Sequence, residues 1–355
     1  TVGATARLYL VINVMQIFIL DAMRVPFWVT AFAILLMILL YTFEGGVKTI
    51  VYTDTLQTSF MLIGLIVCVY YIMQNLGYNF SHTMELLDAR NYTNVFNTDV
   101  NSKGFFVKQI IGGAFITIAM TGLDQEMMQK NISVKNLKDS QKNMITFSVV
   151  IVFVNFLFLL LGGLLYLFAA EKGIAAKGDD LFPTIAIGHF PQAIGIIFIL
   201  GLISALFPSA DGALTALTSS FCIDILGIKR REGMTEKQQK STRMAVHLTF
   251  AVVFLLCIGI FRLIDNKSII GIILDLAGYT YGPLLGLFAF GILTKRVFPD
   301  TWIVTAICLL SPLLSWVISR NSADWFGGYQ IGIELLLING LLTFIGLLTI
   351  SKKPE

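Results

Sequence analysis

The sequence predicts an all-α protein that crosses a membrane many times. Of its 355 residues, 56% are hydrophobic and only 13% are charged, whereas soluble domains usually carry roughly 25% charged residues. The apolar residues form long runs without the alternation of barrel strands. Runs of about 17 or more apolar residues are typical of spanning helices, because a helix satisfies its own backbone hydrogen bonds in hydrocarbon.

Ten apolar runs are the expected spans. They cover residues 8–20, 27–43, 57–76, 107–123, 144–171, 185–226, 244–263, 268–293, 301–319 and 329–350. The run 185–226 fits one long helix, or a short helix followed by a span. The first run is marginal and its connector, "DAMRVP", is very short, so these two spans are either compressed or have lost a segment between them.

The chain opens on "TVGATARLYL", which contains neither an initiator Met nor a signal peptide. We interpret residues 1–355 as a single transmembrane domain that is incomplete at its N-terminus. Two sequons, at Asn79 and Asn91, lie in the loop 77–106 and matter only in a eukaryotic host.

The basic residues predict the orientation, because Lys and Arg in short loops collect on the cytoplasmic side. If Arg7 is cytoplasmic, the basic loop 227–243 and the C-terminus are cytoplasmic too, and the loop 77–106 is extracellular or periplasmic. The net charge of +3 fits this bias and needs no nucleic acid. We therefore expect a multi-pass protein of the plasma membrane, or of the inner membrane in a bacterium, whose environment is the lipid bilayer.

No arrangement of residues points to an enzyme. The four cysteines lie inside apolar runs without a CxxC pair, and the three histidines are scattered, so neither a disulfide framework nor a zinc site is indicated. No GxxxxGK[ST] motif occurs, which argues against an ATP-driven pump.

Ionisable residues inside the spans are the main functional candidates, because a charge in hydrocarbon is costly and usually marks an ion or solute path. Asp54 opens its span among polar neighbours, although a carboxylate at a helix start also complements the helix dipole. Asp275 lies among glycines ahead of Pro283, a pattern that suggests an interrupted helix with exposed carbonyls. Glu334 stands alone near the start of its span and fits an interfacial or structural role.

The stretch 204–224, "SALFPSADGALTALTSSFCID", is the richest. Helical spacing places Ser204, Pro208, Asp211 and Thr215 on one polar face. Pro208 has no N–H, so the carbonyl of Ser204 loses its helical partner. Carbonyl, hydroxyl and carboxylate oxygens together suit a hard cation such as Na⁺. The alternative is a stripe of small residues that lets another helix pack closely.

Four ordered motifs carry a resemblance to a family. "YTFEGGVKTIVYTDTLQT" (41–58), "DQEMMQKNIS" (124–133), the 204–224 stretch and "YGPLLGLFAFGILTKR" (281–296) resemble signatures of the sodium/solute symporter family, which includes sodium/glucose, iodide, proline and sialic acid symporters. Lys130 replaces the family's usual Arg. The resemblance implies the LeuT-type inverted-repeat fold, and the ten spans would be the third to the twelfth core helix.

The resemblance also implies site residues. Ala205, through its carbonyl, Pro208 and Ser209 fall on the family's sodium site, although Pro208 stands where a hydroxyl residue is usual. Asp54 matches an aspartate that helps to bind a second sodium in some members. Asp211 stands where those members have a serine, and is a candidate ligand for a second sodium or for a proton. The substrate-facing positions are Thr117, Met120, Thr121, Asp275 and Gly278.

The leading hypothesis is a sodium-coupled symporter, not an enzyme, that imports a small polar organic solute, with a sugar or a sugar acid as the first guess. Its expected ligands are the solute and Na⁺, and no obligate protein partner is inferred. One alternative is a symporter-like sensor that reports solute binding, which a long soluble extension would favour. The other is a proton-coupled transporter that uses Asp211.

Overall fold

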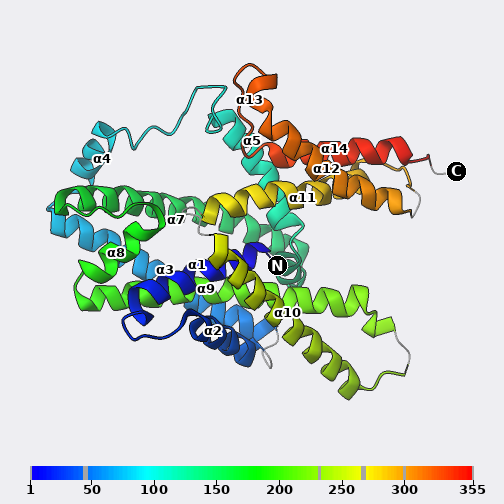
Figure 1. The fold of residues 1–355 in the computed structure, drawn as a ribbon, viewed down its shortest axis with the longest axis horizontal. Coiled ribbons are helices and arrows are strands. Elements are labelled where there is room, and N and C mark those ends of the chain that lie inside the picture. Colours follow the sequence, from blue (N-terminus) through cyan, green and yellow to red (C-terminus); the bar gives the residue numbers. More distant parts are fainter. Residues whose placement is uncertain (1, 43–46, 231–232, 265–268, 299–300, 354–355) are drawn as a thin grey trace. The chain divides into compact units, whose positions relative to one another are not determined.

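The structure is a computed structural model that describes residues 2–42, 47–230, 233–264, 269–298 and 301–353. In these ranges helices dominate, and the paired backbone of Val297 and Lys352 is an isolated antiparallel bridge. The chain divides into two compact units, one of residues Thr1–Thr93 with Lys130–Ile269 and one of residues Asn94–Gln129 with Ile270–Glu355. Each unit is therefore built from segments that are distant in the sequence (Figure 1).

The first unit holds most of the long helices. They are α1 (Val2–Met15), α2 (Phe27–Thr42), α3 (Val47–Leu76), α4 (Phe80–Ala89), α7 (Leu137–Lys172), α8 (Leu181–Gly188), α9 (Gln192–Ser220) and α10 (Glu236–Ile264). Short turns of π-helix, η1 (Gln16–Leu20) and η4 (Phe221–Ile225), extend α1 and α9. The division between the units falls within the helix α6 (Gln125–Ile132), after Gln129.

The second unit is smaller. It contains α5 (Phe106–Thr117), the π-helical turn η2 (Ile118–Gly122), α11 (Ile269–Leu293), α12 (Trp302–Arg320), α13 (Ser322–Trp325) and α14 (Leu335–Ile350). The loop after α11 is tied to the end of α14, because Arg296 donates hydrogen bonds to the hydroxyl and the carbonyl of Ser351, at 2.8 and 2.7 Å.

The ten expected spans match helices of the structure. Within the described residues, seven helices are long and apolar enough to cross a membrane, and three shorter apolar helices, Phe27–Leu40, Phe106–Gly122 and Leu335–Ile350, correspond to the other runs. The run 185–226 proves to be a short helix, α8, followed by the long α9. Many large apolar side chains on these helices are exposed, as expected where lipid replaces water.

The core of the first unit forms where α3, α7, α8 and α9 meet. Its most deeply buried side chains include Cys68, Ile72, Leu164 and Ile185. Glycines bring α3 and α9 close together, since a Cβ at Gly64 would lie 3.5 Å from the carbonyl oxygen of Ile197. Small residues at a crossing let two membrane helices approach closely, so this contact fixes how α9 lies along α3.

The short connector between α1 and α2 folds as a complete turn. The buried amide of Gln16 donates to the Asp21 carboxylate and to the carbonyl of Val25, at 2.5 and 2.6 Å, and it accepts a hydrogen bond from Thr30 at 2.6 Å. The polar groups of the turn thus find partners within it. The compressed arrangement of the first two spans therefore needs no additional segment to satisfy these groups.

The expectation of an interrupted helix around Asp275 is wrong. α11 runs without a break from Ile269 to Leu293 and contains Pro283. Proline removes the hydrogen bond to the carbonyl four residues earlier, which here belongs to Tyr279. The side chain of Asn339 on α14 replaces it, donating to the carbonyls of Tyr279 and Gly278 at 2.9 and 3.1 Å. The freed carbonyl is therefore satisfied by protein and not by a ligand.

Candidate cation and solute sites

The positions predicted for the main sodium site lie midway along α9. The helix continues through Pro208 without a break, from Gln192 to Ser220. The side chains of residues 206–209 lie outside the described part of the structure, and so do the predicted roles of Pro208 and Ser209. Ala205 is described and exposed, and it lines a cavity.

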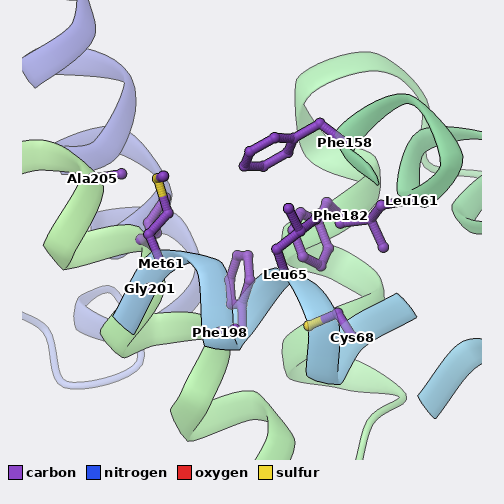
Figure 2. A pocket seen from close by; sticks show the side chains of 11 residues that line it. Met61, Leu65, Cys68, Phe158, Leu161, Phe182, Phe198, Gly201 and Ala205 are labelled. Carbon is purple, nitrogen blue, oxygen red and sulfur yellow. The ribbon is translucent and has the colours of Figure 1, made fainter. Parts of the chain in front are cut away.

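The cavity beside Ala205 is apolar (Figure 2). It measures about 210 Å³ and is lined by Met61, Gly64, Leu65, Cys68, Phe158, Leu161, Phe182, Phe198, Gly201, Leu202 and Ala205. An engineered apolar cavity of about 150 Å³ stays dry and accepts benzene. Since the side chains of this lining offer no hard oxygen ligand, the interior of the cavity does not suit Na⁺.

Asp211 is fully buried on α9, with no exposed surface. One carboxylate oxygen accepts a hydrogen bond from the backbone N–H of Gly212 at 2.5 Å, while Oδ2 has no hydrogen-bond partner. One turn further, the Thr215 hydroxyl is also buried without a partner. A carboxylate at this depth is costly unless a proton or a cation neutralises it. The arrangement therefore offers oxygen atoms to a positive ligand.

Polar contacts continue along this face of α9 towards α10. The Thr218 hydroxyl is buried, donates to the carbonyl of Leu214 at 2.7 Å and lies 2.9 Å from Nδ1 of His247. The contact between Thr218 and His247 agrees in part with the alternative that this face of α9 serves helix packing, because it joins α9 to α10. Asp211 and Thr215 lie outside that contact.

Asp54 lies near the start of α3. Its side chain is half-buried, and three residues on, the buried Oε1 of Gln57 has no hydrogen-bond partner. Gly64 packs on Ile197, and Gly201 packs near Met61, which indicates that α3 and α9 run antiparallel. Asp54 lies about two turns before Met61 on α3, so the antiparallel packing places it level with the part of α9 that follows Ala205.

The predicted solute-facing positions lie in the second unit. Thr117 ends α5, and its hydroxyl donates to the carbonyl of Gly113 at 2.9 Å. Met120 and Thr121 are half-buried in η2, and single π-helical turns often occur at functional sites. Gly278 is buried on α11 and close to Leu335 of α14. The Asp275 side chain lies outside the described residues.

A buried charged cluster in the second unit was not predicted. Lys108 of α5, with a side chain only 6% exposed, lies 3.8 Å from the Glu334 carboxylate and 3.5 Å from the centre of the Tyr329 ring. Its ammonium also donates to the carbonyls of Ser102 and Gln330, at 3.1 and 3.0 Å. The Tyr329 hydroxyl donates to Glu334 at 3.1 Å.

We call Lys108, Tyr329 and Glu334 the lysine cluster. Burial, followed by the charge and the hydrogen bond of Glu334, raises the pKa of Tyr329 above its ordinary value, so the phenol remains a donor. The structural role expected for Glu334 agrees with these contacts. A signal was present in the sequence, because Lys108 and Glu334 have opposite charges near the starts of two spans on the same predicted side of the membrane.

Comparisons with known proteins agree with this architecture. The family model described as "Sodium:solute symporter family" matches residues 9–300. A sodium/sialic acid symporter of Aliivibrio fischeri is 22% identical over 88% of this chain and 63% of its own length. Sodium/glucose cotransporter 1 of Oryctolagus cuniculus is 20% identical over 79% of this chain and 47% of its own length. The chain thus spans less than two thirds of these relatives.

A solved structure gives the fold. A substrate-bound, outward-open Na⁺-coupled sialic acid symporter, 18% identical, superposes with a TM-score of 0.80 over 99% of this chain and 73% of that one. The protein is therefore a multi-pass helical membrane protein with the LeuT-type fold, of a class that consists of transporters and not enzymes. The chain belongs to the sodium:solute symporter family.

Proposed function

We propose that this protein is a sodium-coupled secondary symporter that imports a small polar organic solute by alternating access. The buried Asp211 carboxylate carries the proposal, because its Oδ2 lacks a hydrogen-bond partner inside a helix long and apolar enough to span a membrane. Such a charge needs a positive partner, and a coupling cation supplies one. The family match supports Na⁺ as that cation.

The main sodium site is proposed on α9, with the carbonyl of Ala205 and the Pro208–Ser209 region as ligands. Asp211 and Asp54 are proposed for a second cation. The antiparallel packing of α3 on α9 supports this pairing, because it brings the start of α3 level with that part of α9. Oxygen ligands favour a hard cation.

The proposed solute is a sugar or a sugar acid, since the relatives above are named for sialic acid and glucose. Thr117, Met120, Thr121, Asp275 and Gly278 are the proposed contacts. The π-helical turn at Met120 and Thr121 supports this assignment. In the proposed orientation the loop 77–106 is external, while the loop 227–243 and the C-terminus are cytoplasmic.

Uptake by the full-length protein in proteoliposomes tests the function. Radiolabelled glucose and sialic acid are supplied outside under an inward Na⁺ gradient, an inward K⁺ gradient or an inward proton gradient. The proposal predicts accumulation of at least one of these solutes under the Na⁺ gradient only. Accumulation driven by the proton gradient alone would favour the proton-coupled alternative over sodium coupling. Uptake that is the same under every gradient would contradict coupled transport.

A further inference from the structure

A second cavity lies wholly within the smaller unit. It measures about 430 Å³, within the range of about 300–1,000 Å³ that is typical of small-molecule sites. Its lining combines apolar side chains with polar groups from Gln109, Tyr279 and Ser319, and Lys103 is the one charged residue among the described residues that line it. Amide, hydroxyl and backbone groups beside an aromatic ring suit a polyhydroxylated solute, whose hydroxyls both donate and accept.

The lining residues of the cavity come from loops and helices of this unit. They include Lys103 and Gly104, in the loop proposed to be external, and also Ile116 on α5 and Gly278 on α11. Ile116 directly precedes Thr117, and Gly278 is itself a proposed solute contact. The lining thus combines residues of the loop proposed to be external with one of the proposed solute positions of this unit.

The lysine cluster holds two walls of the cavity together. The Lys108 ammonium binds the carbonyl of Ser102, next to Lys103, and the carbonyl of Gln330, next to the lining residue Ile331. Gln109 adds a hydrogen bond from its amide to the carbonyl of Lys103, at 2.9 Å. A single buried ammonium therefore joins segments that are far apart in the sequence.

We propose that this cavity is an outer binding site for the transported polyhydroxylated solute, and that Lys108 is the positioning residue that fixes its two walls. The inference rests on the proposed function, because it assumes that this solute is the transported one. It adds a place, bordered by Gly278, where the solute binds before it reaches the positions around Thr117 and Met120.

Cysteine protection tests the binding site directly. Ser319 lines the cavity and is half-buried, so a membrane-impermeant thiol reagent added from outside should modify Ser319→Cys, and glucose or sialic acid should slow this reaction. Ser81→Cys, exposed on α4, is the matched control that should react without protection. Labelling of the unsubstituted protein measures the background reaction of its four native cysteines.

The role of Lys108 is tested in the same assay. Lys108→Met combined with Glu334→Gln removes the ion pair without leaving a buried charge unpaired. We expect this double variant to raise the half-protecting solute concentration about tenfold, which equals about 1.4 kcal/mol. Lys108→Arg, which keeps the charge and several donors, should retain most of the protection. If the double variant and the wild type have equal unfolding temperatures, weaker protection reflects the loss of positioning and not a general loss of stability.

The inference and the proposed function fail in different ways. If neither solute protects Ser319→Cys while the wild-type protein accumulates solute under a Na⁺ gradient, the outer site is wrong and the function stands. If protection occurs but uptake ignores Na⁺, the site stands and the coupling is wrong. Unchanged protection in the double variant would contradict the role of Lys108.

Discussion

At the scale of single residues, the partners of each polar group separate structural from functional candidates. Glu334 pairs with Lys108 and Tyr329, and Asn339 serves two backbone carbonyls. The Asp211 carboxylate has only the backbone N–H of Gly212 for one of its oxygens. In the sequence these residues look alike, because each is a polar or charged residue in or beside an apolar run. One oxygen of Glu334 and the amide oxygen of Asn339 are also buried without a hydrogen-bond partner, but both side chains bind distant residues, whereas Asp211 accepts only from the adjacent backbone N–H.

Asn339→Leu should destabilise the protein. The substitution removes the amide that donates a hydrogen bond to the carbonyl of Tyr279. Pro283, four residues later on α11, has no N–H and cannot supply another donor. An unsatisfied buried polar group costs about 1–3 kcal/mol, and in a chain of this size each kcal/mol lowers the unfolding temperature by roughly 2–4 °C. Thermal unfolding in detergent measures the change.

Asn155→Leu is the matched control for this substitution. Asn155 is exposed on α7, so the same replacement should leave the unfolding temperature unchanged or raise it slightly in a lipid-like environment. An equal loss in both variants would mean that the two carbonyl contacts of Asn339 contribute little.

At the scale of elements, three glycines decide how α11 packs on α14. Gly278, Gly282 and Gly286 recur at every fourth position and face α14, where a Cβ on Gly282 would lie 2.3 Å from Asn339 and one on Gly286 would lie 2.5 Å from the carbonyl oxygen of Gly340. This spacing of small residues is typical of close helix contacts in membranes. Gly278 and Gly282, which suggested an interrupted helix, therefore have a packing role.

Gly282→Ala should loosen this contact. The added methyl group overlaps Asn339, and overpacking of this kind costs about 1–3 kcal/mol. We expect a lower unfolding temperature and weaker solute protection of Ser319→Cys, since Gly278 and Leu335 also line the outer cavity. Gly291→Ala on the same helix has nothing within 4 Å of the new methyl group and should change neither measurement. Indistinguishable results for the two variants would refute the packing role.

Sequence reasoning predicts the long helices well and their contacts poorly. Apolar runs must become helices in hydrocarbon, so the ten runs identify the helices that later form the bundle. Hydrogen bonds made by single side chains leave no periodic signal in the sequence. The Gln16 turn, the bond from Asn339 to the carbonyl of Tyr279 and the lysine cluster all depend on side chains that meet only after folding.

At the scale of the whole molecule, the proposed ligands belong to different units. Ala205, Asp54 and Asp211 lie in the first unit, and Thr117 and Gly278 lie in the second. The sequence motifs could identify the family, whose model covers residues 9–300. They could not identify the solute, because the exposure and hydrogen bonds of the solute-facing residues depend on packing that the motifs do not encode.

Sodium-coupled symport requires the proposed cation ligands and the proposed solute contacts to act together. Na⁺ and solute must shift the same conformational equilibrium, and linkage then requires that each raises the affinity for the other by the same factor. A coupling of about tenfold corresponds to about 1.4 kcal/mol. Loss of a cation ligand on α9 should therefore weaken solute binding as well as Na⁺ binding.

The most direct test is equilibrium binding of ²²Na⁺ to the purified full-length protein, compared with Asp211→Asn, which keeps the shape of the side chain and removes its charge. We predict saturable Na⁺ binding that K⁺ does not displace, and at least about tenfold weaker binding or fewer bound ions in the variant, since loss of a charged ligand costs more than about 1.4 kcal/mol. Identical binding by the two proteins, or no saturable binding by the wild type, would contradict the proposal that Asp211 binds one of the coupling cations as Na⁺.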